Sequence, residues 1–365
     1  MRYYDIRITN PSTGQLVKPL YFANLPGFDS SYTSFVNGQT LGGALNIELD
    51  IPISTYAVPQ QGGWLSIYGV SIQEIQQSQN LVGCNVQLFA GMKKGLPLAK
   101  PAQSVDPIME GQIFQCFGNW VGTNMMLQMV FQPGTGRIDA PINLVLDWKA
   151  NTPLRQAILA AFLPFVQNGY TVTIGISDDL KQASDQVGPY PTLATFASEI
   201  LNLSRQQQFL GIKPLGGGVY GGVKITIRGK TIFVYDGTAN VGLATYDNPI
   251  DIAFEDLMGQ PTWVQPNVIN FKTVMRSDLA VGSYVKLPSQ LSVLGITLPP
   301  AAFPGAAARN QSTFKGKFEI VSLHHMGNFR QADGAAWVSI FNAVFVPEPT
   351  VINTLPVNGP SVARV

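Results

Sequence analysis

Strict alternation of apolar and polar residues predicts β-structure over about the first 145 residues. In LNIELDI (45–51), leucine and isoleucine fall on one face of an extended chain, and Asn46, Glu48 and Asp50 fall on the other. This period of two is typical of a half-buried strand. More strand-like segments follow between turns that contain glycine or proline, at residues 64–72, 81–90, 111–120 and 125–131. Their spacing predicts an antiparallel barrel or sandwich.

The pattern changes to a helical period in the middle of the chain. Residues 151–165 are predicted to form a helix, with Thr152 as its N-cap and Pro153 at its first position. Its apolar stripe comprises Leu154, Ala157, Ile158, Ala161, Phe162 and Phe165. A second helix is predicted at 192–207, with Leu193, Phe196, Ala197, Ile200 and Leu201 on one face.

Strand-like segments accompany these helices and resume after them. Residues 170–176 predict a strand, and 223–235 predict a β-hairpin that turns near Arg228 and Gly229, so the middle of the chain is a small α+β module. From about residue 240 the β pattern returns, at 267–275, 283–287, 317–323 and 337–345. The last stretch, 346–365, is rich in proline and lacks periodicity, which predicts an extended arm without a core of its own.

The two β regions resemble each other in three successive blocks. Leu81-Val82-Gly83 matches Ala280-Val281-Gly282, and 109–120 matches 314–329. The third match is 126–133 with 340–347, and both copies end in Val-Phe-x-Pro. The second block ends in Gly-Asn-aromatic in both copies. Strands that follow a glycine are often similar, so one block would mean little. Three blocks in the same order predict two related β-domains.

The spacing between the matched residues increases along the chain. It is 199 positions at Gly83 and Gly282, 205 at Gly111 and Gly316, and 214 at Pro133 and Pro347. Small loop insertions would produce such a change. Two related domains in one chain have a geometric consequence, because a homotrimer would then present six similar units in a ring.

Composition makes an assembly subunit more plausible than a free monomer. Charged residues make up 12% of the 365-residue chain, about half of the usual share near 25%. A surface poor in charge fits a subunit that is largely covered by neighbours, although a surface rich in uncharged polar residues is the alternative. The net charge of +1, without a long basic run, argues against tight nucleic-acid binding but not against a neutral passage for it.

Cysteine content and hydropathy add limits on compartment. Cys84 and Cys116 are too few for a disulfide framework and are expected to be buried, reduced thiols. The first residues lack the basic-then-apolar pattern of a signal peptide. No apolar run reaches the roughly 18–20 residues that a helical membrane span requires, so no membrane insertion is expected.

Candidate chemical motifs are few and weak. His324 and His325 are the only histidines, and neighbours on a strand point to opposite faces, so a shared metal ion is not expected. The glycine-rich segment 214–222 lacks the Gly-Lys-Ser/Thr of a phosphate loop, and 134–139 is expected to be a turn. No G-x-S-x-G motif indicates a serine nucleophile.

Paired carboxylates for glycoside hydrolysis stay open, because such a pair need only meet in space. The candidates are Asp178-Asp179, at the end of a predicted strand, and the segment FEDL (254–257). A turn or cap is the ordinary interpretation of both. The sequence therefore assigns no catalytic, cofactor-binding or metal-binding residue, and no cofactor.

Several phrases of the sequence resemble the central hub proteins of contractile phage tail baseplates. For the first β region these are WLSIYGVSIQEI (64–75), LFAGMKKGLPLAKPAQ (88–103) and GQIFQCFGNWVGT (111–123). For the second they are the segments 254–288, 314–329 and 335–341. The match covers most of the chain but is one of pattern, without a short diagnostic motif.

The resemblance implies a mainly β fold with an α+β insertion and two related tube-like antiparallel β-barrels in one chain. The predicted domains are a first barrel at 1–145, an inserted module at 146–240, a second barrel at 241–347 and a proline-rich arm at 348–365. It implies a homotrimeric, non-enzymatic hub whose pseudo-sixfold ring joins the tail tube or a distal tube protein to the central spike.

Further expected partners are the tape-measure protein, wedge proteins and passing DNA, contacted transiently, in a virion that is assembled in the host cytoplasm. Two alternatives stay open. One is another tube-like component of a tail or secretion system, and the other is a glycan-active baseplate enzyme.

Overall fold

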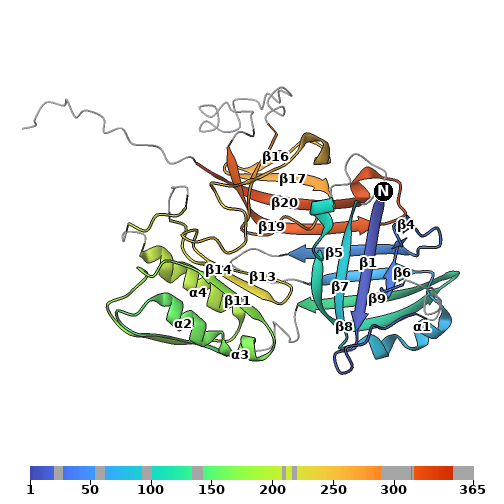
Figure 1. Ribbon diagram of the computed structural model, residues 1–365, viewed down its shortest axis with the longest axis horizontal. Coiled ribbons are helices and arrows are strands. Elements are labelled where there is room, and N and C mark those ends of the chain that lie inside the picture. Colours follow the sequence, from blue (N-terminus) through green and yellow to red (C-terminus); the bar gives the residue numbers. More distant parts are fainter. Residues whose placement is uncertain are drawn as a thin grey trace, which may run out of the picture.

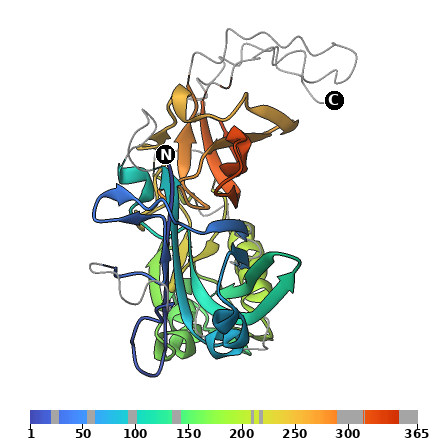
Figure 2. The same cartoon turned by 90° about the vertical axis from the view of Figure 1, so that its right-hand side faces the viewer.

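Two β units lie side by side in one sheet, and a mixed module packs beside them (Figure 1). The computed structural model describes residues 1–19, 28–53, 62–92, 101–133, 143–207, 211–215, 220–288, 314 and 316–347. The predicted arm at 348–365, the turn at 134–139 and part of the glycine-rich segment 214–222 lie outside these residues. Seen from the side in Figure 2, the second unit lies above the first.

The first unit contains six main strands in the order β5-β6-β9-β8-β7-β1. They are β1 (Arg2–Thr9), β5 (Asn46–Ile53), β6 (Gly63–Tyr68), β7 (Asn85–Met92), β8 (Met109–Val121) and β9 (Asn124–Pro133). Short strands β2 (Tyr32–Thr33), β3 (Phe35–Val36) and β4 (Gln39–Thr40) and helix α1 (Ile72–Gln76) complete it. The predicted alternation in β5 is confirmed, because Ile47, Leu49 and Ile51 are buried in the core.

The second unit has the order β16-β17-β20-β19-β18-β15. Its strands are β15 (Ile250–Asp251), β16 (Thr262–Gln265), β17 (Val268–Val274), β18 (Tyr284–Lys286), β19 (Lys317–Asn328) and β20 (Trp337–Val346). Among the described residues neither unit closes into a complete barrel, because the first and last strands of each order do not pair. Instead, the second half of β19 pairs with β5 and joins the units into a 13-stranded sheet.

The same hydrogen bonds occur at equivalent places in both units. The Gly83 amide donates to Ile113 O and the Gly282 amide donates to Ile320 O, each at 2.8 Å. Both glycines have positive φ, 84° and 89°, which a residue with a side chain adopts at a cost. A β-bulge follows directly in each long strand, after Ile113 in β8 and after Ile320 in β19. The predicted relation between the two β regions is therefore confirmed at the level of pairing.

The strand register corrects part of the sequence match. The spacing of 199 positions at Gly83 and Gly282 is right. In the long strands, however, the equivalent residues Ile113 and Ile320 are 207 positions apart instead of 205, and their partners Phe131 and Ala343 are 212 apart instead of 214. The sixth strand also differs, since β1 runs antiparallel to β7 whereas β15 runs parallel to β18.

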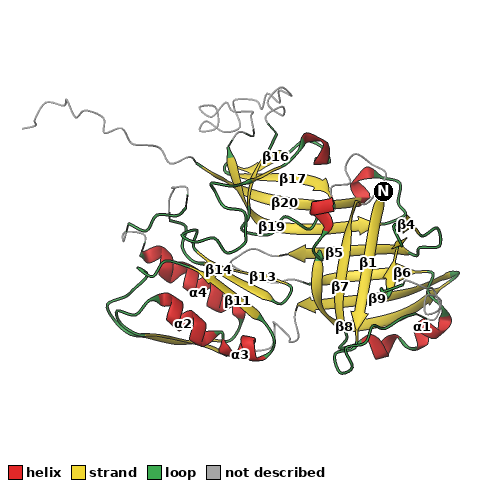
Figure 3. Ribbon diagram, viewed as in Figure 1, coloured by secondary structure: helices red, strands yellow, loops and turns green. Residues whose placement is uncertain are grey.

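The module has its own hydrophobic core between helices and two small sheets (Figure 3). Its strands are β10 (Leu144–Trp148) with β12 (Gln186–Tyr190), and β11 (Thr171–Gly175), β14 (Thr231–Tyr235) and β13 (Lys224–Arg228) in that order. Its helices are α2 (Leu154–Ala161), α3 (Leu163–Gln167) and α4 (Leu193–Gln206). Every residue of the two predicted helical stripes is buried.

One cap prediction in the module is wrong. The N-cap of α2 is Pro153, and the side chain of Thr152 donates to Lys149 O instead of capping the helix. The single helix predicted at 151–165 is also divided, because α3 begins again at Leu163 with Pro164 in its first turn. The hairpin predicted at 223–235 is confirmed as β13 and β14.

Candidate functional surface

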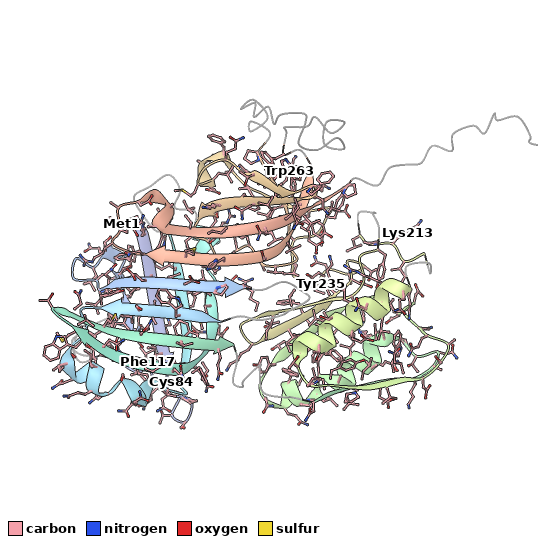
Figure 4. All side chains as sticks on the ribbon, turned by 180° about the vertical axis from the view of Figure 1, so that it is seen from behind. Met1, Cys84, Phe117, Lys213, Tyr235 and Trp263 are labelled. Atoms are coloured by element: carbon pink, nitrogen blue, oxygen red, sulfur yellow. The ribbon has the colours of Figure 1, made fainter. Side chains whose placement is uncertain are left out.

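One face of eight consecutive strands is the candidate functional surface. The strands are ordered β16-β17-β20-β19-β5-β6-β9-β8, and one side of this path covers the cores of both units. Figure 4 shows the other side, with the strands lying next to one another and β1 behind them. We call this side the open face. In β8 and β19 it includes only the residues after the β-bulges, that is from Gln115 and from Ser322 onward.

Polar side chains on the open face are hydrogen-bonded to one another across the strands. Tyr68 Oη donates to Glu48 Oε2 at 2.8 Å, and Asn328 Nδ2 donates to Glu48 Oε1 at 2.7 Å. A second row joins Asn270, Asn342 and Ser322 at 2.8 and 2.9 Å. Antiparallel sheets commonly tolerate such a polar face toward water. These cross-strand bonds hold the side chains in defined positions.

The open face carries few ionisable groups. Among the described residues they are Glu48, Asp50, Lys272 and His324, since they point away from the cores in the paired strands. His324 Nε2 lies 2.7 Å from Asp50 Oδ1, so this pair links β19 to β5. Two carboxylates against one lysine and one histidine make a surface that is close to neutral, without the cation cluster of a phosphate-binding site.

A buried ion cluster fixes the two units against each other. Arg276, which is 2% exposed, donates to Asp278 through Nε and Nη2, each at 2.6 Å, and to Asp256 at 3.3 Å. Gln103, from the first unit, donates to the same Asp256 oxygen at 2.8 Å. The Ser277 amide donates to Gln103 O at 2.7 Å. Because a buried charge is tolerated only with such partners, the cluster specifies one arrangement of the units.

A second set of contacts fixes the module to both units. Lys224 Nζ of β13 donates to Glu319 of β19, and both side chains are largely buried. Arg228 Nη2 contacts Asp106 of the first unit and Ser277 O of the second, each at 2.8 Å. A cavity of about 30 Å³ lies between the three bodies and is lined by residues of each, including Ile108, Thr226 and His325. Its volume suits about one water molecule.

His325 shows what this environment does to a titratable group. Its ring is fully buried and Nδ1 lies 2.8 Å from Ser339 Oγ. Burial lowers the pKa of His325 to about 3, with smaller contributions from His324 and Arg228. The ring is therefore neutral over the physiological range.

The fold can now be compared with known proteins. No family model matches the sequence, and no curated protein matches it. Among solved structures, a 43 kDa tail protein of prophage MuSo2 from Shewanella oneidensis superimposes with a TM-score of 0.50 at 7% identity, over 94% of this chain and 98% of that one. The chain has the fold of a phage tail protein.

Two further structures are similar at a lower level. A tail protein from Neisseria meningitidis MC58 gives a TM-score of 0.47 at 10% identity, over 95% of this chain and 97% of that one. An Escherichia coli component of the type VI secretion system, described as similar to the phage T4 tail proteins gp27 and gp5, gives 0.47 at 10% identity, over 84% and 76%. The predicted fold class, mainly β with an α+β insertion and two related units, is confirmed.

The candidate chemical residues do not come together in this tail-protein fold. His324 and His325 point to opposite faces of β19, toward Asp50 and Ser339 respectively. In the loop after β11, the Asp179 amide is bonded to Ser177 Oγ, as expected of a turn. Within FEDL, Asp256 binds Arg276. Among the described residues, no group of three His, Cys, Asp or Glu side chains could hold a metal ion.

Both cysteines are free and buried, as predicted. Burial raises the pKa of Cys116 to about 12, so its thiol is unreactive. None of the described helices is both long and apolar enough to cross a bilayer. The residue that sequence reasoning missed is Arg276, and an arginine in a chain with so few charges is the signal that could have indicated it.

Proposed function

We propose that this protein is the structural hub of a phage tail baseplate, where three copies form a ring of six similar units. The observation that carries the proposal is the internal repeat, since both units share five strands in the same order and, apart from a β-bulge in β16, with the same register. Three copies of a duplicated chain can match a sixfold tube on one side and a threefold spike on the other.

The open face is proposed to line the central passage of this ring. Its near-neutral, hydrogen-bonded surface suits a wall along which DNA moves without binding. The tape-measure protein would occupy the same passage before the genome does. The role is mechanical, and we propose no catalytic residue and a location in the virion tail.

The remaining parts are proposed to recognise other baseplate proteins. The module at 146–240 and the arm at 348–365 have no counterpart within the repeat, whose units we place at 1–145 and 241–347. They would break the sixfold equivalence and contact the spike or wedge proteins. The module's outer surface is suited to this, because Leu159, Leu163 and Val166 are exposed apolar residues on it.

Native mass spectrometry combined with electron microscopy tests the proposal. We expect a homotrimer whose averaged images show six similar lobes around a central opening. A protein that stays monomeric alone and in its native particle would refute the proposal. A clearing zone on cell-wall zymograms would instead support the glycan-active alternative.

A further inference from the structure

The joint between the two units inside one chain shows how neighbouring chains would join. In this joint, Leu323–Asn328 of β19 pairs antiparallel with Glu48–Ile53 of β5. The repeat gives each strand an equivalent in the other unit. Strand β8 corresponds to β19, and β16 corresponds to β5. The equivalent joint would therefore be β8 against β16, and it is not made within one chain.

Among the described residues, no second strand pairs with the outer edge of β16 or of the second half of β8, although Gln79 Nε2 donates to the Cys116 carbonyl of β8 at 3.0 Å. Strand β16 pairs only with β17 and ends the order of the sheet. Strand β8 pairs with β9 throughout, but with β7 only from Met109 to Gln112, so no described strand pairs with the other edge of its second half. The two edges lie at opposite ends of the eight-strand path (Figure 1).

The register of the missing joint follows from the register of the existing one. His325 pairs with Ile51 within the chain, and their equivalents are Gly118 and Trp263. The neighbouring pair His324 and Pro52 becomes Phe117 and Val264 by the same spacings, where Val264 is the extra residue of a β-bulge between Trp263 and Gln265. We propose that the second half of β8 pairs antiparallel with β16 of a second copy of this chain, with Phe117 opposite Val264 and Gly118 opposite Trp263.

Side-chain exposure supports this register. Phe117 is 44% exposed and Val264 is 56% exposed, although both belong to strands of the central sheet. Trp120 and Val121, at the end of β8, are 66% and 69% exposed. Gly118 and Trp263 fall on the opposite face, toward Ile75 and Phe318 respectively. Pairing the edges would place Phe117 against Val264 and keep both strands in phase.

The contact uses different surfaces on the two copies. One chain contributes β8 and the next contributes β16, so the interface is head-to-tail and continues until a ring closes. Closure after three copies rests on the proposed function, whereas the pairing of these two edges rests on the internal joint. The open face would then continue from one copy to the next, with the apolar residues Phe117 and Val264 at the joint.

Engineered cysteines test the register directly. Directly opposite residues of an antiparallel pair have Cα atoms about 4.5–5.5 Å apart, within the range that a disulfide spans. Under mild oxidation, a mixture of full-length Phe117→Cys and Val264→Cys chains should give a covalent dimer that contains one of each. Neither variant should cross-link alone. A chain with both substitutions should give a ladder that ends at trimer.

Two controls separate this inference from the proposed function. In the first control, Phe117→Cys chains are mixed with Val187→Cys chains in place of Val264→Cys chains. Val187 is 64% exposed on the module, and this mixture should give at least tenfold less cross-linked product. Phe117→Asp should increase, at least tenfold, the protein concentration at which half of the trimer is dissociated. Val187→Asp should leave this concentration unchanged. Circular dichroism confirms that each variant is folded.

The outcomes are distinct. A trimer in native mass spectrometry whose Phe117→Cys and Val264→Cys chains cross-link no better than the Val187 control would overturn the register and leave the hub proposal standing. Cross-linking of Phe117→Cys with itself would indicate a symmetric contact and also overturn it. A protein that is monomeric throughout and does not cross-link would refute both.

Discussion

The two units differ in the connection that precedes the repeated glycine. In the first unit, the connection runs from Gly69, whose amide binds Met125 O, to Gly83, and contains helix α1. In the second, it runs from the equivalent Met275, whose amide binds Trp337 O, to Gly282. This second connection is shorter by seven residues and carries Arg276.

The difference shows how one chain adapts two copies of a fold to two environments. The second connection lies between the units, where the buried Arg276 binds Asp256 and Gln103 of the first unit donates to the same carboxylate. In the first connection, α1 packs against β8 and β9 of its own unit and carries its own local cap. The strands keep the repeat, and the connections define the position of each unit.

The largest loss of stability is expected when Arg276 in the second connection is replaced. Arg276→Met leaves the buried Asp256 without its cation, and breaking a buried ion pair costs about 3–5 kcal/mol. We expect a loss of that size in the free energy of unfolding, measured by urea denaturation. Arg155→Met, at an exposed arginine of α2, is the matched control and should change it by less than about 0.5 kcal/mol. Equal effects of the two substitutions would contradict the assigned role.

Acid should destabilise the protein through His325, whose equivalent in the first unit is Gly118. The unfolded chain takes up a proton near pH 6.5, whereas the folded protein keeps this ring neutral down to about pH 3. The stability that the neutral His325 ring contributes is therefore fully present above the unfolded pKa of 6.5, and it is lost progressively as the pH decreases below that value. At 1.36 kcal/mol per pKa unit, the loss by pH 4 is about 3 kcal/mol.

The variant His325→Asn isolates this contribution, because asparagine can keep a hydrogen bond to Ser339 but does not titrate. We expect the unfolding free energy of the variant to depend less steeply on pH between 6.5 and 4 than that of the parent protein. Parallel curves for the two proteins would show that His325 is not responsible.

The glycine at the equivalent place in the first unit should resist enlargement. A Cβ added at Gly118 would lie 2.6–2.9 Å from the side chain and backbone of Ile75 in α1. Overpacking of this kind costs about 1–3 kcal/mol. We expect Gly118→Ala to lower the melting temperature, whereas Gly42→Ala, with no atom within 4 Å of the new Cβ, should leave it nearly unchanged. A neutral Gly118→Ala would mean that α1 moves freely over β8.

The smallest effect is expected at the cap of α1. Ser71 and Glu74 form a capping box, in which each side chain accepts a bond from the other residue's backbone amide. Replacing such a serine by alanine costs about 1 kcal/mol. Ser71→Ala should therefore reduce the unfolding free energy by that amount, and Ser12→Ala, at an exposed serine in a turn, should not.

The sequence predicts the strands and the repeat well where local chemistry determines them. Gly83 and Gly282 are found because a positive φ demands glycine at both turns. The long strands are matched two positions out of register, at 205 instead of 207 and at 214 instead of 212. A shift of two residues keeps every side chain on the same face, so alternation alone cannot detect it.

The open face and the ion cluster could not be predicted in the same way. Arg276 and Gln103, which are far apart in the chain, both donate to Asp256, and a single charge has no periodicity. The seam between β5 and β19 depends on which strand edges meet, and edges carry no compositional signal of their own. Thr152 was misplaced as a cap because Pro153 is itself the residue with extended backbone before α2.

On the proposed ring, the hydrogen-bonded rows of the open face would determine how a polymer travels. Tyr68, Asn328 and Glu48 already satisfy one another, and so do Asn270, Asn342 and Ser322. A phosphate chain passing over them would meet no deep energy well in which to pause. Friction would then be low and uniform along the bore, and the speed of ejection would be set by the pressure behind the genome instead of by the wall.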